Sequence, residues 1–194
     1  MRDAALARRR PAAGLLLVGF LALGACATAD PPRPALRSEV RPGGPHRADM
    51  LAPGDVIPDF AAPGLRGERV SWKDREGAPA VLVVWAAWCP HCQRLLPMLA
   101  RVAREFPAVQ LVSVTTSIGR FSGPSPAEFL ERSGLSFPVA LDDPDNRLAH
   151  ALGVYRYPVV YWTGRDGRVR AVTLGESTET ALRQGFRLAL ADPP

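Results

Sequence analysis

From Leu51 onward, the apolar residues follow the pattern of a chain in which strands alternate with helices. Ala80–Trp85 is a continuous apolar run rich in valine, which is typical of a strand buried on both faces. Val109–Val114 is the next buried strand that we expect. Val159–Trp162 and Val169–Leu174 predict a hairpin, because the short segment between them contains the glycines of a tight turn. These segments form the expected central sheet.

Other segments have the apolar spacing of helices. The longest contains Pro97, which is expected to kink it. In the next one, Ser125 followed by a proline and by Glu128 predicts a capping box. The predicted helices are Gln93–Phe106, Pro126–Ser133, Asp145–Leu152 and Glu179–Leu190, the last capped by Ser177 or Thr178. Shorter strands are expected at Val56–Phe60 and Glu68–Trp72, around a Gly64–Gly67 turn, and at Phe137–Leu141. The fold class is therefore α/β, with an N-terminal β-hairpin ahead of the sheet.

Residues 1–25 have the composition of an export signal. A basic start is followed by an apolar or small-residue run from Pro11 to Ala25. At about fifteen residues this run is shorter than the ~20 that a membrane-spanning helix needs. We therefore expect residues 1–25 to be a signal peptide, with its basic charge carried by Arg2, Arg8, Arg9 and Arg10.

Residues 26–50 are rich in proline and glycine and contain few large apolar side chains. Such a segment cannot bury enough surface to order itself, so we interpret it as a tether between the signal and a folded domain at residues 51–194.

The chain has a formal net charge of +5, to which the basic start contributes much. No later stretch gathers arginines with interleaved aromatic residues, which argues against nucleic acid as a partner.

The candidate chemistry lies in Cys89 and Cys92, which follow a buried strand and open a helix. A first thiol at a helix N-terminus meets unpaired N–H groups and the positive end of the helix dipole, both of which favour the reactive thiolate. His91 adds a potential cation or hydrogen-bond donor beside it, and Pro90, between Cys89 and His91, is included among the expected catalytic residues. Cys92 lies one turn further in, where it can resolve a mixed disulfide. Cys89 is therefore the expected nucleophile and Cys92 the resolving cysteine.

The run from Val81 to Cys92 resembles the strand and active-site loop of the thioredoxin superfamily. Gly54–Phe60 resembles the N-terminal hairpin of the membrane-tethered TlpA/ResA-type group, and Pro97 matches the kink proline of the thioredoxin active-site helix. Gly153–Pro158 resembles the cis-proline segment of the family. The resemblance covers roughly residues 52–192. It implies a thioredoxin-like fold, in which helices flank a central mixed sheet.

The same resemblance implies roles for three further residues. Pro158 would follow a cis peptide bond and face the disulfide, Tyr157 would offer backbone hydrogen bonds to a bound peptide, and Trp88 would line the thiol surface. Separately, Leu23-Gly24-Ala25-Cys26 resembles the lipobox of bacterial lipoproteins. That resemblance implies cleavage before Cys26 and lipidation of this residue.

Two departures from the family leave the direction of electron flow open. Thioredoxin has a buried aspartate six residues before its first cysteine, where this chain has Val83. The Pro90-His91 dipeptide resembles that of strongly oxidising periplasmic enzymes, whereas the surrounding domain resembles dedicated reductants.

Rival functions use the same cysteines. A zinc site needs about four ligands, and the chain offers only scattered histidines and Cys26 besides the pair. A copper chaperone using two cysteines and a histidine is an alternative, with His91 and His150 as candidates. A peroxiredoxin-like peroxidase would need a proline and a threonine or serine where Leu82 and Ala86 stand. An inert disulfide is disfavoured because so small a ring stabilises little.

The sequence therefore predicts an exported, lipidated thiol-disulfide oxidoreductase of the periplasm that needs no cofactor or metal. Its expected partners are protein thiols and disulfides, a membrane or periplasmic redox partner, and the membrane itself through Cys26. The expected site residues are Cys89, Cys92, His91, Pro90, Trp88, Tyr157 and Pro158.

Overall fold

The computed structural model of the chain describes residues 39–40 and 49–191. Cys26, the expected signal peptide and most of the expected tether lie outside these residues. Two residues of the segment expected to be a tether, Glu39–Val40, form the short strand β1, which pairs antiparallel with β2. Among the described residues, no helix has the length and apolar character needed to cross a membrane.

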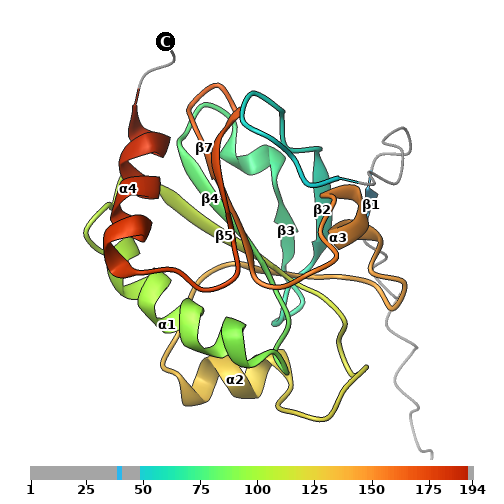
Figure 1. The fold of residues 1–194 in the computed structure, drawn as a ribbon. Helices are drawn as coiled ribbons and strands as arrows, with labels where there is room; N and C mark the ends of the chain where they lie inside the picture. Colours follow the sequence, from blue (N-terminus) through green and yellow to red (C-terminus); the bar gives the residue numbers. More distant parts are fainter. Residues whose placement is uncertain (1–38, 41–48, 192–194) are drawn as a thin grey trace, which may run out of the picture. The chain divides into compact units, whose positions relative to one another are not determined.

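A five-stranded mixed sheet forms the centre of the fold, as the sequence predicts (Figure 1). Its strand order is β6-β5-β4-β7-β8. β4 is parallel to β5, and β5 is parallel to β6, whereas β7 is antiparallel to both β4 and β8. The strands are β4 (Ala80–Trp85), β5 (Gln110–Thr115), β6 (Val139–Leu141), β7 (Val159–Thr163) and β8 (Val169–Leu174).

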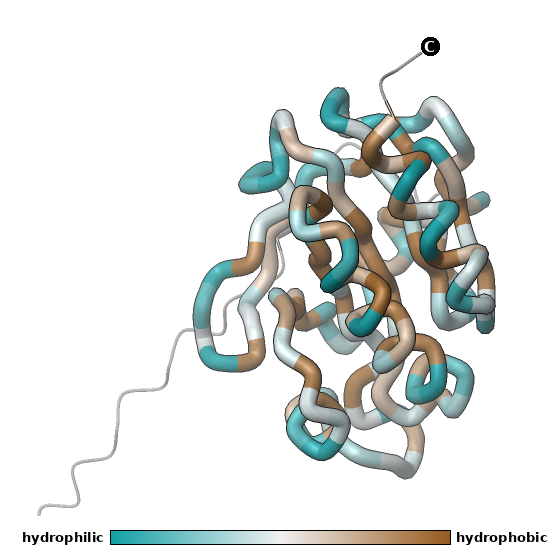
Figure 2. The backbone as a smooth tube through the Cα atoms, turned by 90° about the vertical axis from the view of Figure 1, so that its left-hand side faces the viewer, coloured by the Kyte–Doolittle hydropathy of each residue, from teal (hydrophilic) through white to brown (hydrophobic). Residues whose placement is uncertain are grey.

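The two faces of the sheet are covered by different elements (Figure 1). α1, α2 and α4 pack on one face and share a core cluster with Val81, Val83 and Trp85 of β4. α3 and the β2–β3 hairpin cover the other face and share a cluster with Leu82 and Val84. Hydrophobic positions accordingly concentrate along the inner strands (Figure 2). The helices are α1 (Pro90–Ala103), α2 (Pro126–Arg132), α3 (Arg147–Ala151) and α4 (Glu179–Leu190).

The N-terminal hairpin is present, but its first strand begins later than predicted. β2 spans Phe60–Pro63 and β3 spans Arg69–Ser71, followed by the 3₁₀ turn η1 at Lys73–Arg75. The expected start of this strand at Val56 is wrong. Residues 54–56 pair instead with residues 168–169, at the beginning of β8. Gly54 N donates to Val169 O and Val169 N donates to Asp55 O, each at 2.8 Å. Pro58, which has no N–H to donate, then separates this contact from β2.

The predicted helix caps are confirmed at α2 and α4. Ser125 Oγ accepts from Glu128 N at 3.2 Å, and Glu128 Oε2 accepts from Ser125 N at 2.7 Å, which completes the capping box. Of the two candidates at α4, Thr178 is the cap, since its Oγ1 accepts from Ala181 N. Pro97 lies inside α1, and this helix begins at Pro90, three residues before the predicted start.

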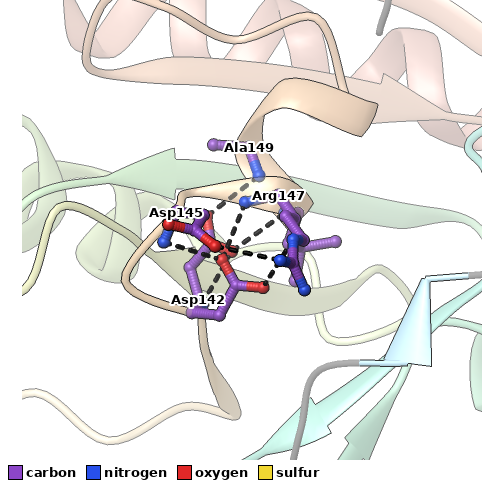
Figure 3. A network of polar contacts seen from close by, with 6 residues as sticks. Asp142, Asp145, Arg147 and Ala149 are labelled. Carbon is purple, nitrogen blue, oxygen red and sulfur yellow. Dashed lines mark hydrogen bonds and ion pairs between the residues drawn. The ribbon is translucent and has the colours of Figure 1, made fainter. Parts of the chain in front are cut away.

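Helix α3 begins two residues later than predicted because Asn146 has a left-handed backbone, with φ 56° and ψ 34°. The buried carboxylate of Asp142 caps the helix from a distance (Figure 3). Its Oδ1 accepts from Leu148 N at 2.9 Å and its Oδ2 from Ala149 N at 3.0 Å. Burial raises the pKa of Asp142, while these N–H donors oppose the rise by stabilising the carboxylate. At the exposed end of the same network, Arg147 pairs with Asp145 at 3.0 Å.

Gly185 in α4 provides a test of the packing between this helix and the sheet. A Cβ at this position would lie 2.3–2.6 Å from ring atoms of the buried Trp162. Gly185→Ala is therefore expected to destabilise the protein by about 1–3 kcal/mol through overpacking, although alanine favours a helix. Chemical denaturation measures this free energy of unfolding. The control is Gln184→Ala at an exposed position of the same helix, which is expected to be neutral or slightly stabilising. A Gly185→Ala protein as stable as this control would contradict the packing described here.

Candidate active site

The topology of the sheet brings distant segments to one edge. β4, β5 and β8 run in the same direction, so their carboxyl ends lie at the same edge, where β7 begins. Cys89 follows β4, Ser117 follows β5, Pro158 precedes β7, and Glu176 follows β8. The carboxyl edge of an open α/β sheet is where such folds commonly bind their ligands. The candidate site is therefore assembled from four separate parts of the chain.

The two thiols differ in their position on α1. Cys89 is the N-cap residue, with an extended backbone, and Cys92 lies inside the first turn. Both are free thiols; Cys89 is 5% exposed and Cys92 is 0% exposed. Burial raises the pKa of Cys92, and negative charge on Cys89 would raise it further. Cys92 is thus held as a protonated thiol behind Cys89.

The expected cis peptide bond is present between Tyr157 and Pro158. The Tyr157 carbonyl faces the first thiol and accepts a hydrogen bond from Cys89 Sγ at 3.7 Å. This residue is therefore beside the candidate nucleophile, as the resemblance implies.

Aromatic side chains surround the entry to α1. Trp88 is half-buried, and its ring packs against Phe121 at a centroid distance of 4.4 Å and against Tyr157 at 6.3 Å. Trp85 belongs instead to the core, where it packs against Phe129. Trp88 is thus the tryptophan that packs against Tyr157, whose carbonyl accepts from Cys89, and Phe121 is an aromatic neighbour of Trp88 that the sequence did not indicate.

A polar network supports this aromatic cluster from behind. Trp88 Nε1 donates to Ser117 O, and the hydroxyls of Ser117 and Tyr157 contact each other, both at 3.3 Å. Ser117 has a left-handed backbone, with φ 53°. The buried Asn146 holds it there, since Asn146 Oδ1 accepts from Ser117 N and from Thr116 Oγ1, each at 2.9 Å. The residues beside Cys89 therefore depend on an asparagine at the start of α3.

Charged side chains gather around His91. Glu176 accepts a bidentate pair of hydrogen bonds from Arg94, at 3.0 and 2.6 Å, and lies 2.5 Å from His91 Nδ1. These contacts lower the pKa of Glu176 to about 2, with the Arg94 hydrogen bond as the larger cause and the His91 contact as the second. At any pH well above 2 the Glu176 carboxylate is therefore ionised and able to accept from Arg94.

Sequence reasoning missed Arg94, Glu176, Ser117 and Asn146. Arg94 could have been found, because it lies three residues after His91 on the same helix. The others are distant in sequence and carry no motif. His150 is not part of the site; it stacks on Tyr155 at a centroid distance of 5.0 Å.

These features define a thioredoxin-like domain with a Cys-x-x-Cys pair at the start of a helix and, next to the first thiol, the carbonyl of a residue that precedes a cis-proline. The chain belongs to the AhpC/TSA family, whose model matches residues 53–172.

Comparison with individual proteins supports the same class. The thiol-disulfide oxidoreductase ResA of Bacillus subtilis is 26% identical over 140 residues, covering 72% of this chain and 77% of ResA. A crystal structure of a thiol:disulfide interchange protein DsbE from Chlorobium tepidum has a TM-score of 0.64 at 29% identity, covering 73% of this chain and all of that one. The exposed lipoprotein thioredoxin Etrx1 of Streptococcus pneumoniae has a TM-score of 0.54 at 27% identity, covering 66% and 98%. The predicted enzyme class, thiol-disulfide oxidoreductase, is thereby confirmed.

The different positions of the two thiols on α1, together with the raised pKa of Cys92, predict selective alkylation. In the reduced native protein, iodoacetamide at pH 8 is expected to modify Cys89 and to leave Cys92 unmodified, because Cys92 is 0% exposed and its raised pKa keeps it protonated. Peptide mass spectrometry measures the extent of modification at each residue. In urea, both cysteines should react at similar rates. Equal modification of the two in the native protein would contradict this arrangement of α1.

Proposed function

We propose that this protein is an extracytoplasmic, membrane-tethered oxidoreductase that exchanges disulfides with other proteins through Cys89 and Cys92. The observation that carries the proposal is the inequality of the two thiols on α1. Cys89 stands at the helix N-terminus beside Tyr157, whereas Cys92 is fully buried behind it.

In the reducing direction, the Cys89 thiolate attacks one sulfur of a substrate disulfide. This step forms a mixed disulfide and releases one substrate sulfur as a thiolate, which takes up a proton. Cys92 then loses its proton and attacks Cys89 Sγ, which releases the second substrate thiol. Two electrons pass to the substrate, and the protein is left with a Cys89–Cys92 disulfide. The oxidising direction is the same sequence reversed.

The surroundings of the pair suit this exchange. The raised pKa of Cys92 keeps it from competing as the first nucleophile, and its burial protects it from solution oxidants. The Tyr157 carbonyl, which accepts from Cys89 Sγ, is a backbone acceptor that a bound peptide can use once the thiol has reacted. The cis peptide bond to Pro158 directly follows this carbonyl, and Trp88 packs against the Tyr157 ring.

The reduction potential of Cys89–Cys92 assigns the direction of electron flow. A value near about −120 mV marks an oxidant, and a value below about −250 mV marks a reductant. Val83, which replaces the thioredoxin aspartate, is fully buried in β4, so no carboxyl group reaches the pair from that position.

We further propose that residues 1–25 direct export and that Cys26 carries the lipid anchor. The basic start, the short apolar run and the lipobox-like Leu23–Cys26 support this location. The likeness to a structure described as an exposed lipoprotein thioredoxin also supports it. Several acyl chains on one residue would hold the domain at a membrane, which a single chain does only marginally.

The alternatives gain no support from the site. Among the residues that the structure describes, no three of His, Cys, Asp and Glu are grouped so that they could hold a metal ion, as a copper chaperone would require. At the positions where a peroxiredoxin has its proline and hydroxyl residue, Leu82 and Ala86 are packed in the core.

Trapping of mixed disulfides tests the exchange. The Cys92→Ser variant is expected to accumulate covalent complexes with substrate proteins, because nothing resolves the bond at Cys89. Non-reducing gels followed by mass spectrometry identify the linked residues. The matched control is Cys89→Ser, which should trap none, and the double variant gives the background. A Cys92→Ser protein that forms no more complexes than this background would refute the proposal.

Lipidation predicts a change in partition. When the full chain is expressed in a bacterium, the wild-type protein is expected in the detergent phase of a Triton X-114 extract and should incorporate labelled palmitate. Cys26→Ser should be unlabelled and should partition into the aqueous phase. Cys92→Ser serves as the control for loss of an unrelated cysteine and should behave as the wild type. A wild-type protein without label would refute lipidation and leave the exchange proposal standing.

A further inference from the structure

A carboxylate lies beside the first turns of α1, and backbone contacts hold the loop that carries it. Glu176 belongs to the short connection between β8 and α4. The residue before it, Gly175, has a left-handed backbone, with φ 80°, and its N–H donates to the Pro158 carbonyl at 2.8 Å. The preceding carbonyl of the same segment, that of Tyr157, accepts from Cys89. The loop of Glu176 is therefore attached to the segment that contacts the first thiol.

Glu176 contacts two basic side chains of α1. It accepts two hydrogen bonds from Arg94, at 3.0 and 2.6 Å, and its Oε1 lies 2.5 Å from His91 Nδ1. Arg94 Nη2 also lies 3.1 Å from His91 Nδ1, so the three side chains form one network. A single exposed ion pair usually contributes little, but a bidentate arginine–carboxylate pair within a network is the arrangement in which such charges matter. Glu176 therefore acts on neighbours in a defined geometry.

The charge of this network reaches the first thiol. The hydrogen bond to Glu176 is the largest cause of the raised pKa of Arg94, and negative charge on Cys89 raises it as well. Because the interaction between two charges is mutual, Arg94 also stabilises a thiolate at Cys89. The carboxylate of Glu176 has the opposite sign and opposes this stabilisation. Two further groups beside Cys89, the protonated Cys92 thiol and the Tyr157 carbonyl, carry no charge.

The reduction potential of the pair depends on which redox form these charges favour. When glutathione reduces the Cys89–Cys92 disulfide, two glutathione thiols become one glutathione disulfide and two electrons pass to the protein. The product has a thiolate at Cys89 and a thiol at Cys92, and one proton is released to solution. The disulfide is uncharged, whereas the reduced form carries the negative charge of the thiolate. Positive charge nearby therefore favours the reduced form and raises the reduction potential, and negative charge lowers it.

We propose that Glu176 lowers the reduction potential of the cysteine pair by offsetting the positive charge that Arg94, and His91 when protonated, place beside the Cys89 thiolate. Glu176 acts through the two basic side chains that it contacts, so it is a positioning residue. The inference rests on the exchange proposed above and concerns the direction of its electron flow. The dipeptide between the cysteines resembles that of strong oxidants, and Glu176 shifts the pair toward the reductants.

Redox titration of the full chain with glutathione at pH 8 tests the inference, because the thiolate of a cysteine at a helix N-terminus is populated there. Differential alkylation and peptide mass spectrometry measure the redox state of the Cys89–Cys92 pair. At an ionic strength of about 0.1 M, Glu176→Gln is expected to increase the equilibrium constant for reduction about threefold, a factor usual for exposed charges. This change corresponds to a potential about 14 mV more positive. Arg94→Gln should decrease the same constant about threefold.

The matched control is Glu105→Gln, which makes the same change of charge away from the thiols. Glu105 accepts a bidentate pair of hydrogen bonds from Arg183, both at 2.8 Å, and its side chain is 43% exposed, against 44% for Glu176. It follows the C-terminal end of α1, and the 14 residues of this helix span about 21 Å. That length exceeds the Debye length of about 10 Å at 0.1 M, so the equilibrium constant of this variant should equal that of the wild type.

The directions of the two shifts separate an effect of charge from an effect on structure. Glu176→Gln and Arg94→Gln break the same ion pair, so a structural role would move the equilibrium constant in the same direction in both variants. Shifts in the same direction, or a Glu176→Gln shift no larger than that of Glu105→Gln, would overturn the inference. A Cys89–Cys92 pair that forms no disulfide in any glutathione buffer would instead overturn the exchange proposal itself.

Discussion

Strand β4 pairs with β5 on one side and with β7 on the other, and the position of every group in the site depends on this central pairing. All six of its residues are buried, so the strand cannot slip by one position without moving its two sets of side chains into the wrong core clusters. The fixed register places Cys89 at the carboxyl edge. The same edge receives the ends of β5 and β8 and the start of β7, which bring the partners of the thiol.

The expected chemistry of Cys89 and Cys92 follows from their different positions in the first turn of α1. Cys89 is the N-cap residue of α1, next to the Tyr157 carbonyl, while Cys92 lies inside the first turn of the helix; both thiols belong to the core cluster shared by α1 and β4. Burial keeps the second thiol protonated until the first has reacted. In the proposed exchange, packing therefore sets the order in which the two thiols react, and His91 and its charged neighbours lie outside the core.

Around the thiol, two kinds of surface are maintained by residues that never touch it. Asn146 holds Ser117, which in turn positions Trp88 and Tyr157. Glu176 joins Arg94 and His91 into one charged group. The loop after β5 therefore gives the site an apolar side, and the loop after β8 gives it a charged one. Both sides are built from residues far apart in the chain.

The sequence by itself determined the local features, because each depends on near neighbours. The valine-rich runs, the Ser125 capping box, α4 and the order Cys89-Pro90-His91-Cys92 could be recognised from spacing and composition. It misplaced the first strand of the hairpin, since residues 54–56 have the pattern of a strand but pair with β8. Only the tertiary structure decided which groups meet at the sheet edge. Phe121, Asn146 and Glu176 carry no motif, and they come within reach of the site only because strand order, which local periodicity does not encode, brings their loops together.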